Sequence, residues 1–215
     1  IASCLVGSEM CIRDRFMGLK FKVNSNVLIP RQDTETLVEE ALKTVKPGMK
    51  VLDMCTGSGC ILLSILKRYQ VQGTGADISS EALQVAERNR KHLALPQVEW
   101  LQSDLFEKIE EKYDVIVSNP PYIQTGVIES LQEEVRLHDP YIALDGKEDG
   151  LYFYRRIIED AKAYLEDGGW LLFEIGYDQA EPVTRLMEQA GYSEIHVKKD
   201  LSGLDRVAGA RYNKN

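Results

Sequence analysis

The sequence has few cysteines and no long apolar run. No stretch of its 215 residues approaches the roughly 18 apolar residues that a membrane-spanning helix needs. The first residues also lack the charged start and apolar core of a signal peptide. The cysteines form no Cys-x-x-Cys pair and no cluster with histidine, which argues against a zinc site or a disulfide framework; they are Cys4, Cys11, Cys55 and Cys60. We therefore expect no membrane attachment, no metal and a cytoplasmic location.

A long basic run is missing as well. The chain carries 26 Lys and Arg against 34 Asp and Glu, for a net charge of −8 and a pI of about 5.0. Binding to a phosphate backbone requires clustered positive charge, so nucleic acid is not expected as a direct substrate. The length fits one domain with a substantial core, and we expect a monomer.

The chain divides into three regions. Residues 1–15 (IASCLVGSEMCIRDR) show no clean period, and their SEMCIRDR run resembles translated sequencing-adapter read-through. We treat them as a candidate artefact and assign them no function. Residues 16–48 predict a hairpin that ends at Pro30 and a helix over about 33–45, capped by Asp33 or Thr34. Residues 49–215 form the main domain.

Strands and helices alternate through the main domain. Their succession predicts an α/β, Rossmann-like fold with a mostly parallel sheet, helices on both faces and an antiparallel edge hairpin. The irregular stretch at 119–148 has the length of a functional loop. The expected strands are 50–54, 73–77, 98–103, 113–118, 170–175, 192–198 and 205–212, and the expected helices are 59–69, 79–92, 149–166 and 178–190. The Tyr and Phe residues around 141–154 could line the mouth of a pocket, but core packing of Tyr152, Phe153 and Tyr154 in the third helix is the favoured interpretation.

A glycine-rich turn follows the first of these strands, in the segment VLDMCTGSGC at 51–60. Gly57 and Gly59 allow a tight reversal and a close approach of the backbone to a ligand. A dinucleotide fingerprint would have a third glycine where Leu62 stands. Asp53 at the strand end would also repel a phosphate, whereas it would attract the positively charged amino acid part of S-adenosylmethionine, directly or through water. The turn therefore favours S-adenosylmethionine as cofactor.

Two further aspartates end the next strands. Asp77 lies 20 residues after Gly57, where a carboxylate can accept hydrogen bonds from a ribose diol. Asp104 is positioned to accept from the adenine amino group, with Leu105 or Phe106 packed on the ring. A single such aspartate is as often a helix cap or a solvated turn residue. All three strand-end aspartates beside the glycine turn favour a cofactor site.

The fourth strand leads directly into Asn119-Pro120-Pro121-Tyr122. Prolines have no N–H, so this loop presents carbonyl oxygens. The Asn119 side-chain oxygen and the Pro120 carbonyl can together accept both N–H bonds of an amide or aromatic amine, and Tyr122 offers a flat face to the planar group. By itself the segment could be an ordinary proline-rich turn. After a fourth parallel strand it predicts methylation of a planar nitrogen.

In these segments the chain resembles the release factor glutamine methyltransferases. The likeness covers about 16–212 and is carried by FMGLKFKV, VLIPRQDTE, VLDMCTGSGC, SDLF, DVIVSNPPYI, DGLYFYRRII, FEIG and DLSGLDRVAGAR. It implies a class I methyltransferase fold with a seven-stranded sheet, and modification of the glutamine in the Gly-Gly-Gln loop of class 1 peptide chain release factors. It implies cofactor contacts at 55–59 (Cys55, Thr56, Gly57, Ser58 and Gly59), Asp77, Leu105 and Asn119. It places the glutamine on Asn119 to Tyr122, near Pro30, Arg31 and Glu35.

The chain departs from that family pattern in two respects. Cys55 stands where members usually have glycine, so the turn has to tolerate a small side chain there. Members also carry an N-terminal helical domain that helps to dock the release factor. We expect that domain to be absent here, with residues 1–15 in its place, and substrate docking to suffer accordingly.

Three other functions are compatible with the same motifs. A related enzyme could methylate a glutamine on a ribosomal protein through the same loop. An adenine-amine methyltransferase acting on nucleic acid could grip an exocyclic amine, although it would need a basic face and aromatic stacking for a flipped base. From a different class, the chain could be an inactive cofactor-binding fragment, against which the intact Asn119 and Tyr122 argue.

Overall fold

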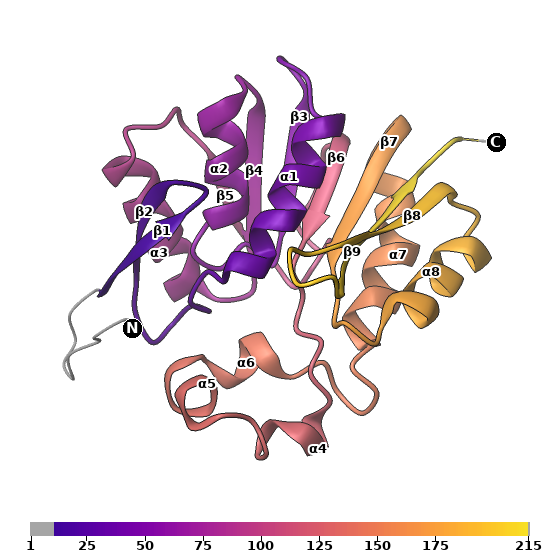
Figure 1. The fold of residues 1–215 in the computed structure, drawn as a ribbon. Helices are drawn as coiled ribbons and strands as arrows, with labels where there is room; N and C mark the ends of the chain where they lie inside the picture. The colour runs from indigo at the N-terminus through magenta and orange to yellow at the C-terminus, as the bar shows by residue number, and fades with distance from the viewer. Residues whose placement is uncertain (1–10, 215) are drawn as a thin grey trace.

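The computed structural model describes residues 11–214, without the side chains of 11–14, 134, 137 and 138. Its centre is a seven-stranded sheet of order β5-β4-β3-β6-β7-β9-β8 (Figure 1). The first five strands in this order run parallel to one another. β9 pairs antiparallel with both of its neighbours, β7 and β8. This confirms the predicted fold. The strands are β3 (Lys50–Met54), β4 (Gln72–Asp77), β5 (Glu99–Gln102), β6 (Tyr113–Ser118), β7 (Leu165–Glu174), β8 (Ser193–Lys199) and β9 (Asp205–Arg211).

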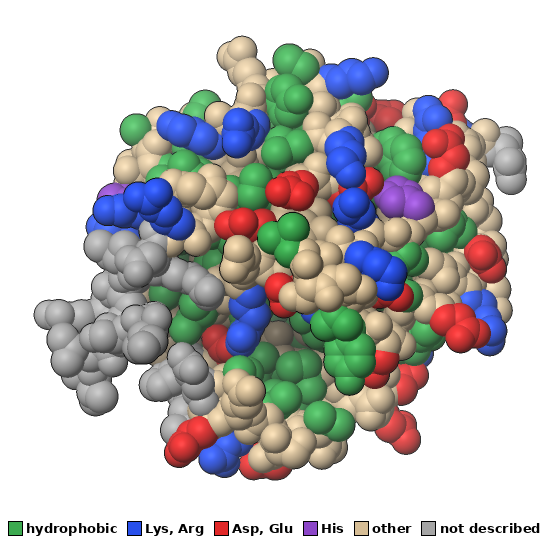
Figure 2. Space-filling view, viewed as in Figure 1, with side chains coloured by type: hydrophobic (Ala, Val, Ile, Leu, Met, Phe, Trp, Pro, Cys, Tyr) green, Lys and Arg blue, Asp and Glu red, His purple; other side chains and the backbone are tan. Residues whose placement is uncertain are grey.

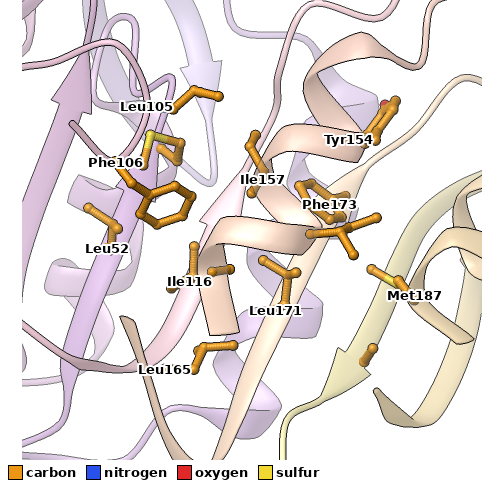
Figure 3. Packing of buried hydrophobic residues seen from close by; sticks show 14 of the residues in the cluster. Leu52, Leu105, Phe106, Ile116, Tyr154, Ile157, Leu165, Leu171, Phe173 and Met187 are labelled. Atoms are coloured by element: carbon orange, nitrogen blue, oxygen red, sulfur yellow. The ribbon is translucent and has the colours of Figure 1, made fainter. Parts of the chain in front are cut away.

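Helices cover both faces of the sheet (Figure 1). On one face, α1 (Glu35–Thr44) and α2 (Cys60–Arg68) bury apolar residues against strand side chains such as Val115 and Val117, and α3 (Ser80–His92) lies over β4 and β5. On the other, α7 (Tyr152–Tyr164) and α8 (Ala180–Gln189) complete a second apolar cluster. Figure 3 shows Ile157 of α7 beside the sheet residues Ile116, Leu171 and Phe173. Burial on both faces explains why the central strands are continuous apolar runs.

An N-terminal hairpin packs beside α3. Its strands, β1 (Cys11–Phe16) and β2 (Leu19–Val23), are joined through Met17 and Gly18, which both have positive φ (50° and 77°) as a tight hairpin turn requires. Asn89 of α3 accepts from the Lys22 N–H at 2.8 Å and donates to the Lys22 carbonyl at 3.0 Å. The predicted hairpin is therefore present, but it begins inside 1–15 and ends before Pro30. Residues 1–10, with Cys4, lie outside the described part.

The segment between β6 and α7 is more ordered than the sequence predicts. It contains three short helices, α4 (Thr125–Ile128), α5 (Glu133–His138) and α6 (Tyr141–Leu144). Helices of four to six residues are too short to show a helical period, so pattern analysis missed them. They form a lobe at the carboxyl edge of the sheet (Figure 1).

Two other boundaries differ from prediction. A 3₁₀ turn, η1 (Gln32–Thr34), precedes α1, and Thr34 at its N-cap makes no side-chain capping bond. β7 begins at Leu165, before the two glycines at 168 and 169, and its pairing with β6 shifts register there. Among residues 11–214, no helix is long and apolar enough to cross a membrane.

Candidate cofactor and substrate site

A cavity of about 300 Å³ opens at the carboxyl ends of β3, β4 and β6. Strand order reverses direction at β3, because β4 lies on one side of it and β6 on the other; ligands of open α/β sheets bind at such a point. Figure 2 shows the hollow above the lobe, with apolar side chains inside it. Of the predicted site residues, the cavity brings together Pro30, Cys55, Thr56, Gly57, Ser58, Asp77, Asp104, Leu105, Asn119 and Pro121.

Asp53 lies beneath the turn and does not line the cavity. Its carboxylate is fully buried, and one oxygen accepts from the Thr56 hydroxyl at 2.6 Å and from the Leu62 N–H at 3.3 Å. The other oxygen has no hydrogen-bond partner. Burial raises the pKa of Asp53 to about 7, against the lowering effect of the Thr56 bond. In this position Asp53 holds the turn together, and the expected direct contact with a ligand is not supported.

The turn itself uses left-handed backbone at three positions. Cys55, Gly57 and Gly59 have φ values of 61°, 54° and 77°. Cys55 lines the cavity while its side chain packs against the core, and burial raises the pKa of its thiol well above the usual range. Gly59 is not in the wall: it is the N-cap residue of α2, and a Cβ there would lie 3.1 Å from that of Ala86 in α3. Gly59 therefore serves the packing of two helices.

Asp77 ties the turn to the start of α3. One of its oxygens accepts from the Gly57 N–H and the other from the Ser79 N–H, both at 2.9 Å. Burial raises the pKa of its carboxyl group. The N-cap of α3 is Ser79, whose hydroxyl accepts from the Ala82 N–H at 3.1 Å. Asp77 is thus not the helix cap, which was the alternative interpretation of this residue.

Asp104 and Leu105 occupy the next strand end. Asp104 accepts from the Arg156 guanidinium at 3.0 Å and its side chain is 39% exposed. Leu105 lines the cavity with φ 48°. Phe106 instead stacks on Tyr164 in the core, with ring centroids 4.9 Å apart. Of the two apolar candidates, Leu105 is therefore the one that lines the cavity.

The Asn-Pro-Pro-Tyr loop contributes Asn119 and Pro121 to the wall, but neither Pro120 nor Tyr122. The Tyr122 ring packs against the core beneath the loop, and its hydroxyl donates to Glu174 at 3.2 Å. Burial raises the pKa of Tyr122 well above its usual value. The predicted stacking of Tyr122 on a planar substrate does not match this orientation, because the long-range bond to β7 turns the ring inward.

The VLIPR segment reaches the cavity through Pro30 only. Arg31 pairs with Asp139 of the lobe at 2.6 Å, and the Asp139 side chain is buried. Glu35 accepts from the Met17 N–H at 2.6 Å and so holds the hairpin turn. Neither Arg31 nor Glu35 lies in the wall, contrary to expectation.

Several wall residues were not predicted. Tyr152, Phe153 and Arg156 come from the first turns of α7, and the Arg156 guanidinium lies over the Tyr152 ring at 5.6 Å from its centroid. Only Tyr154 is a core residue, as expected; Tyr152 is 38% exposed. The lobe adds Pro140, Ile142, Ala143 and Lys147, and the stretch after the hairpin adds Asn26, Val27, Leu28 and Thr34. The aromatic residues around 141–154 and the i, i+4 spacing of Tyr152 and Arg156 were the available signals.

The histidines give no sign of a metal site. His92 is exposed, and a ring nitrogen of His196 lies 3.1 Å from the Glu40 carboxylate. Neither histidine lines the cavity. In the described part of the chain, no group of three or more His, Cys, Asp or Glu residues could hold a metal ion. The side chain of His138 lies outside the described residues.

Comparison with known proteins agrees with this geometry. Residues 31–136 match the model of the methyltransferase small domain. The release factor glutamine methyltransferase of Geobacter sulfurreducens is 45% identical over 199 residues, covering 91% of this chain and 69% of that protein. That of Clostridium acetobutylicum is 47% identical over 93% and 72% of the two chains. The chain belongs to the release factor glutamine methyltransferase family.

A solved structure of the same family superposes as well. It is the release factor-specific protein-(glutamine-N5) methyltransferase from Alicyclobacillus acidocaldarius, 32% identical, with a TM-score of 0.53, covering 90% of this chain and all of that one. The membership confirms the class I methyltransferase fold, the assignment of the chain as a methyltransferase, and S-adenosylmethionine as its methyl donor.

Proposed function

We propose that the chain methylates the side-chain amide nitrogen of the glutamine in the Gly-Gly-Gln motif of class 1 peptide chain release factors. The observation that carries the proposal is the composition of one cavity wall. The glycine turn, Asp77, Asp104 and Asn119 all meet there. The names of the relatives, which span most of both chains, support release factors as the substrate class.

The residues of the wall fit S-adenosylmethionine. Asp77 and Asp104 would accept from the ribose hydroxyls and the adenine amino group, with Leu105 against the ring. Both carboxylates already accept from protein donors, but each carboxylate oxygen has two lone pairs and can take a further donor. The Cys55–Gly59 turn would face the amino acid part, with Asp53 holding it from below. The cofactor supplies an electrophilic methyl group on a positively charged sulfur.

Asn119 and Pro120 would orient the substrate nitrogen. An amide nitrogen is a poor nucleophile because its lone pair is delocalised. Pro120 is not in the wall itself, but its carbonyl is flanked along the chain by Asn119 and Pro121, which are. If the Asn119 side-chain oxygen and that carbonyl accept the two N–H bonds of the amide, the lone pair is aimed at the methyl group and positive charge developing on nitrogen is stabilised. The new N–C bond replaces the S–C bond, S-adenosylhomocysteine leaves, and the nitrogen loses one proton to water.

The remaining substrate residues receive revised roles in this proposal. Pro30 and Pro121 bound the pocket for the glutamine side chain. Tyr122 anchors the loop from below. Arg31 and Glu35 act at a distance, Arg31 by tying the segment before α1 to the lobe and Glu35 by holding the hairpin.

The setting of the reaction is part of the proposal. We place the protein in the cytoplasm as a monomer, with no nucleic acid as direct substrate, because its few thiols and acidic charge suit a reducing compartment and a protein partner. Residues 16–48 lead into the methyltransferase domain at 49–215.

A methyl-transfer assay tests the proposal. The chain is incubated with S-adenosylmethionine and purified release factor, and the mass of the peptide that contains the Gly-Gly-Gln motif is measured by mass spectrometry. We expect one added methyl group with the wild-type chain, almost none with Asn119→Ala, and wild-type levels with Asn213→Ala, an exposed asparagine near the C-terminus. Full methylation by Asn119→Ala would refute the role of Asn119.

Parallel incubations separate the alternatives. Methylation of a ribosomal protein without the release factor would favour the ribosomal enzyme. Methylation of an oligonucleotide would favour the adenine-amine enzyme. Binding of labelled S-adenosylmethionine with no transfer to any of the three would indicate an inactive cofactor-binding fragment.

A further inference from the structure

Gln179 lies at the N-cap of α8, but its side chain turns inward and does not cap the helix. The residue is 8% exposed. Its Oε1 accepts from the Gly176 N–H at 3.0 Å, while its Nε2 donates to the carbonyls of Tyr122 and Gly150 at 3.0 and 3.3 Å. One buried amide therefore joins three backbone segments: the end of β7, the Asn-Pro-Pro-Tyr loop and the residues that precede α7.

The loop depends on contacts of this kind because it has few donors of its own. Pro120 and Pro121 have no N–H, so neither can be held through a backbone donor. The next donor with a partner is Ile123, whose N–H bonds to the Leu144 carbonyl at 3.0 Å. The bond from Gln179 to the Tyr122 carbonyl anchors the loop just before that point.

Close packing around Tyr122 adds to this anchor. A Cβ on Gly150 would lie 2.4 Å from the Tyr122 carbonyl oxygen and 2.8 Å from Nε2 of Gln179. A Cβ on Gly146 would lie 2.7 Å from Cα of Tyr122. The Tyr122 hydroxyl is held at the same time by Glu174. The backbone and the ring of Tyr122 are thus both fixed, which leaves the loop little freedom.

We propose that Gln179 is a positioning residue for methyl transfer: by clamping the Tyr122 carbonyl it sets where Asn119 and Pro120 hold the substrate nitrogen. The proposal rests on the proposed function of that loop. Gln179 itself does not line the cavity. Replacement of the Gln179 side chain should therefore lower kcat and leave the affinity for S-adenosylmethionine nearly unchanged. A misplacement of about 1 Å at a reacting group can lower the rate by about 100-fold.

Gln179→Glu gives the sharpest test, because its effect depends on pH. The new side chain has the same shape, but as a carboxylate it would place an oxygen against the Tyr122 and Gly150 carbonyls. Burial and the two facing carbonyls favour the neutral acid, although the Gly176 N–H still donates to the other oxygen. The protonated form regains one donor for the loop. Gln179→Met has a similar length, no donor and no titration. Gln189→Glu adds the same charge at an exposed position of the same helix and is the matched control.

The expected result has three parts. At about pH 8.5, kcat of Gln179→Glu on the release factor falls by about 10- to 100-fold, and this deficit shrinks as the pH is lowered to about 6. Gln179→Met is slow at both pH values, and Gln189→Glu matches the wild type. The Kd for S-adenosylmethionine, measured by calorimetry, stays within about twofold of wild type in all variants, because the turn and Asp77 are untouched.

Hydrogen exchange provides a readout that does not depend on activity. In Gln179→Glu at about pH 8.5 the amides of Ile123 and Gly146 should exchange faster, while those of α2 remain as protected as in the wild type. If the wild type is active and Gln179→Glu is equally active at about pH 8.5, the positioning role of Gln179 is wrong and the proposed function still stands. If the wild type is inactive, the proposed function is wrong. If the Ile123 amide of Gln179→Glu then also exchanges at the wild-type rate, the contact of Gln179 with the loop does not hold the loop in place.

Discussion

At the scale of single residues, Cys55 occupies backbone that suits glycine. Its φ of 61° is left-handed, which costs an L-residue about 1–2 kcal/mol. Cys55→Val adds a branched side chain at this position and should lower the free energy of unfolding by about 2 kcal/mol. Cys55→Gly removes the strain and should stay within about 1 kcal/mol of wild type. Urea unfolding of the three proteins checks the order, and a stable valine variant would contradict it.

Asp53 should make stability depend on pH. Burial raises its pKa in the folded state to about 7, from an ordinary value of 3.8. Between these values the folded state holds a proton that the unfolded state has released, so the free energy of unfolding falls as pH rises and levels off above about 7. Asp53→Asn keeps an acceptor for Thr56 and Leu62 but does not titrate. Its stability relative to wild type should rise by about 1.4 kcal/mol per unit of pKa difference.

Urea unfolding of both proteins without cofactor, from about pH 4 to about pH 9, measures this difference. Parallel pH profiles for the wild type and Asp53→Asn would show that the carboxyl group does not titrate in this window.

At the scale of elements, two glycines of the same turn differ in what surrounds them. A Cβ on Gly57 meets nothing within 4 Å, whereas one on Gly59 would crowd Ala86, Leu63 and Trp100 at 3.1–3.2 Å. Gly57→Ala bears only the cost of positive φ, about 1 kcal/mol. Gly59→Ala should lose about 1–2 kcal/mol more, because α2 and α3 must move apart. Thermal unfolding ranks the pair, and equal losses would contradict the packing argument.

The elements that the sequence predicted well are those with a clear local period. Alternating or continuous apolar runs identified all seven strands of the main sheet, and helical spacing identified α2 and α3 to within about two residues. The three helices of the lobe were not predicted because they are too short to show a helical period. The early start of β1 was not predicted because the strand is defined by its pairing with β2 and not by the pattern of its own residues.

At the scale of the whole molecule, cofactor binding should stabilise the fold. A ligand at about 100 times its Kd adds about 2.7 kcal/mol, which for a chain of this size corresponds to a rise in Tm of roughly 5–10 °C. Differential scanning fluorimetry with S-adenosylhomocysteine, the unreactive product, checks this. Asp104→Ala, at a half-exposed position of the wall, should lose most of the shift while its own Tm stays close to wild type. An unchanged shift would remove Asp104 from the cofactor site.

Part of the candidate site could be read from residue order. Chain position places Asp77, Asp104 and Asn119 at successive strand ends, and parallel pairing then brings strand ends to one edge. Position along the chain says nothing about the direction of a side chain. Tyr122, Arg31 and Glu35 each bond to a residue from another part of the chain, and those bonds turn them out of the wall.

The sequence by itself determined the α/β alternation, the glycine turn and the place of Asn119 after the fourth strand, because each depends on neighbours within a few residues. Only the tertiary structure decided that Asp53 lies under the turn, that Arg156 and the lobe complete the wall, and that Gln179 holds the loop. The contacts of Arg156 and Gln179 join residues tens of positions apart, and the full burial of Asp53 comes from the packing around it; no local pattern encodes either. The geometry of the site is therefore a property of the fold, although its chemistry was visible in the chain.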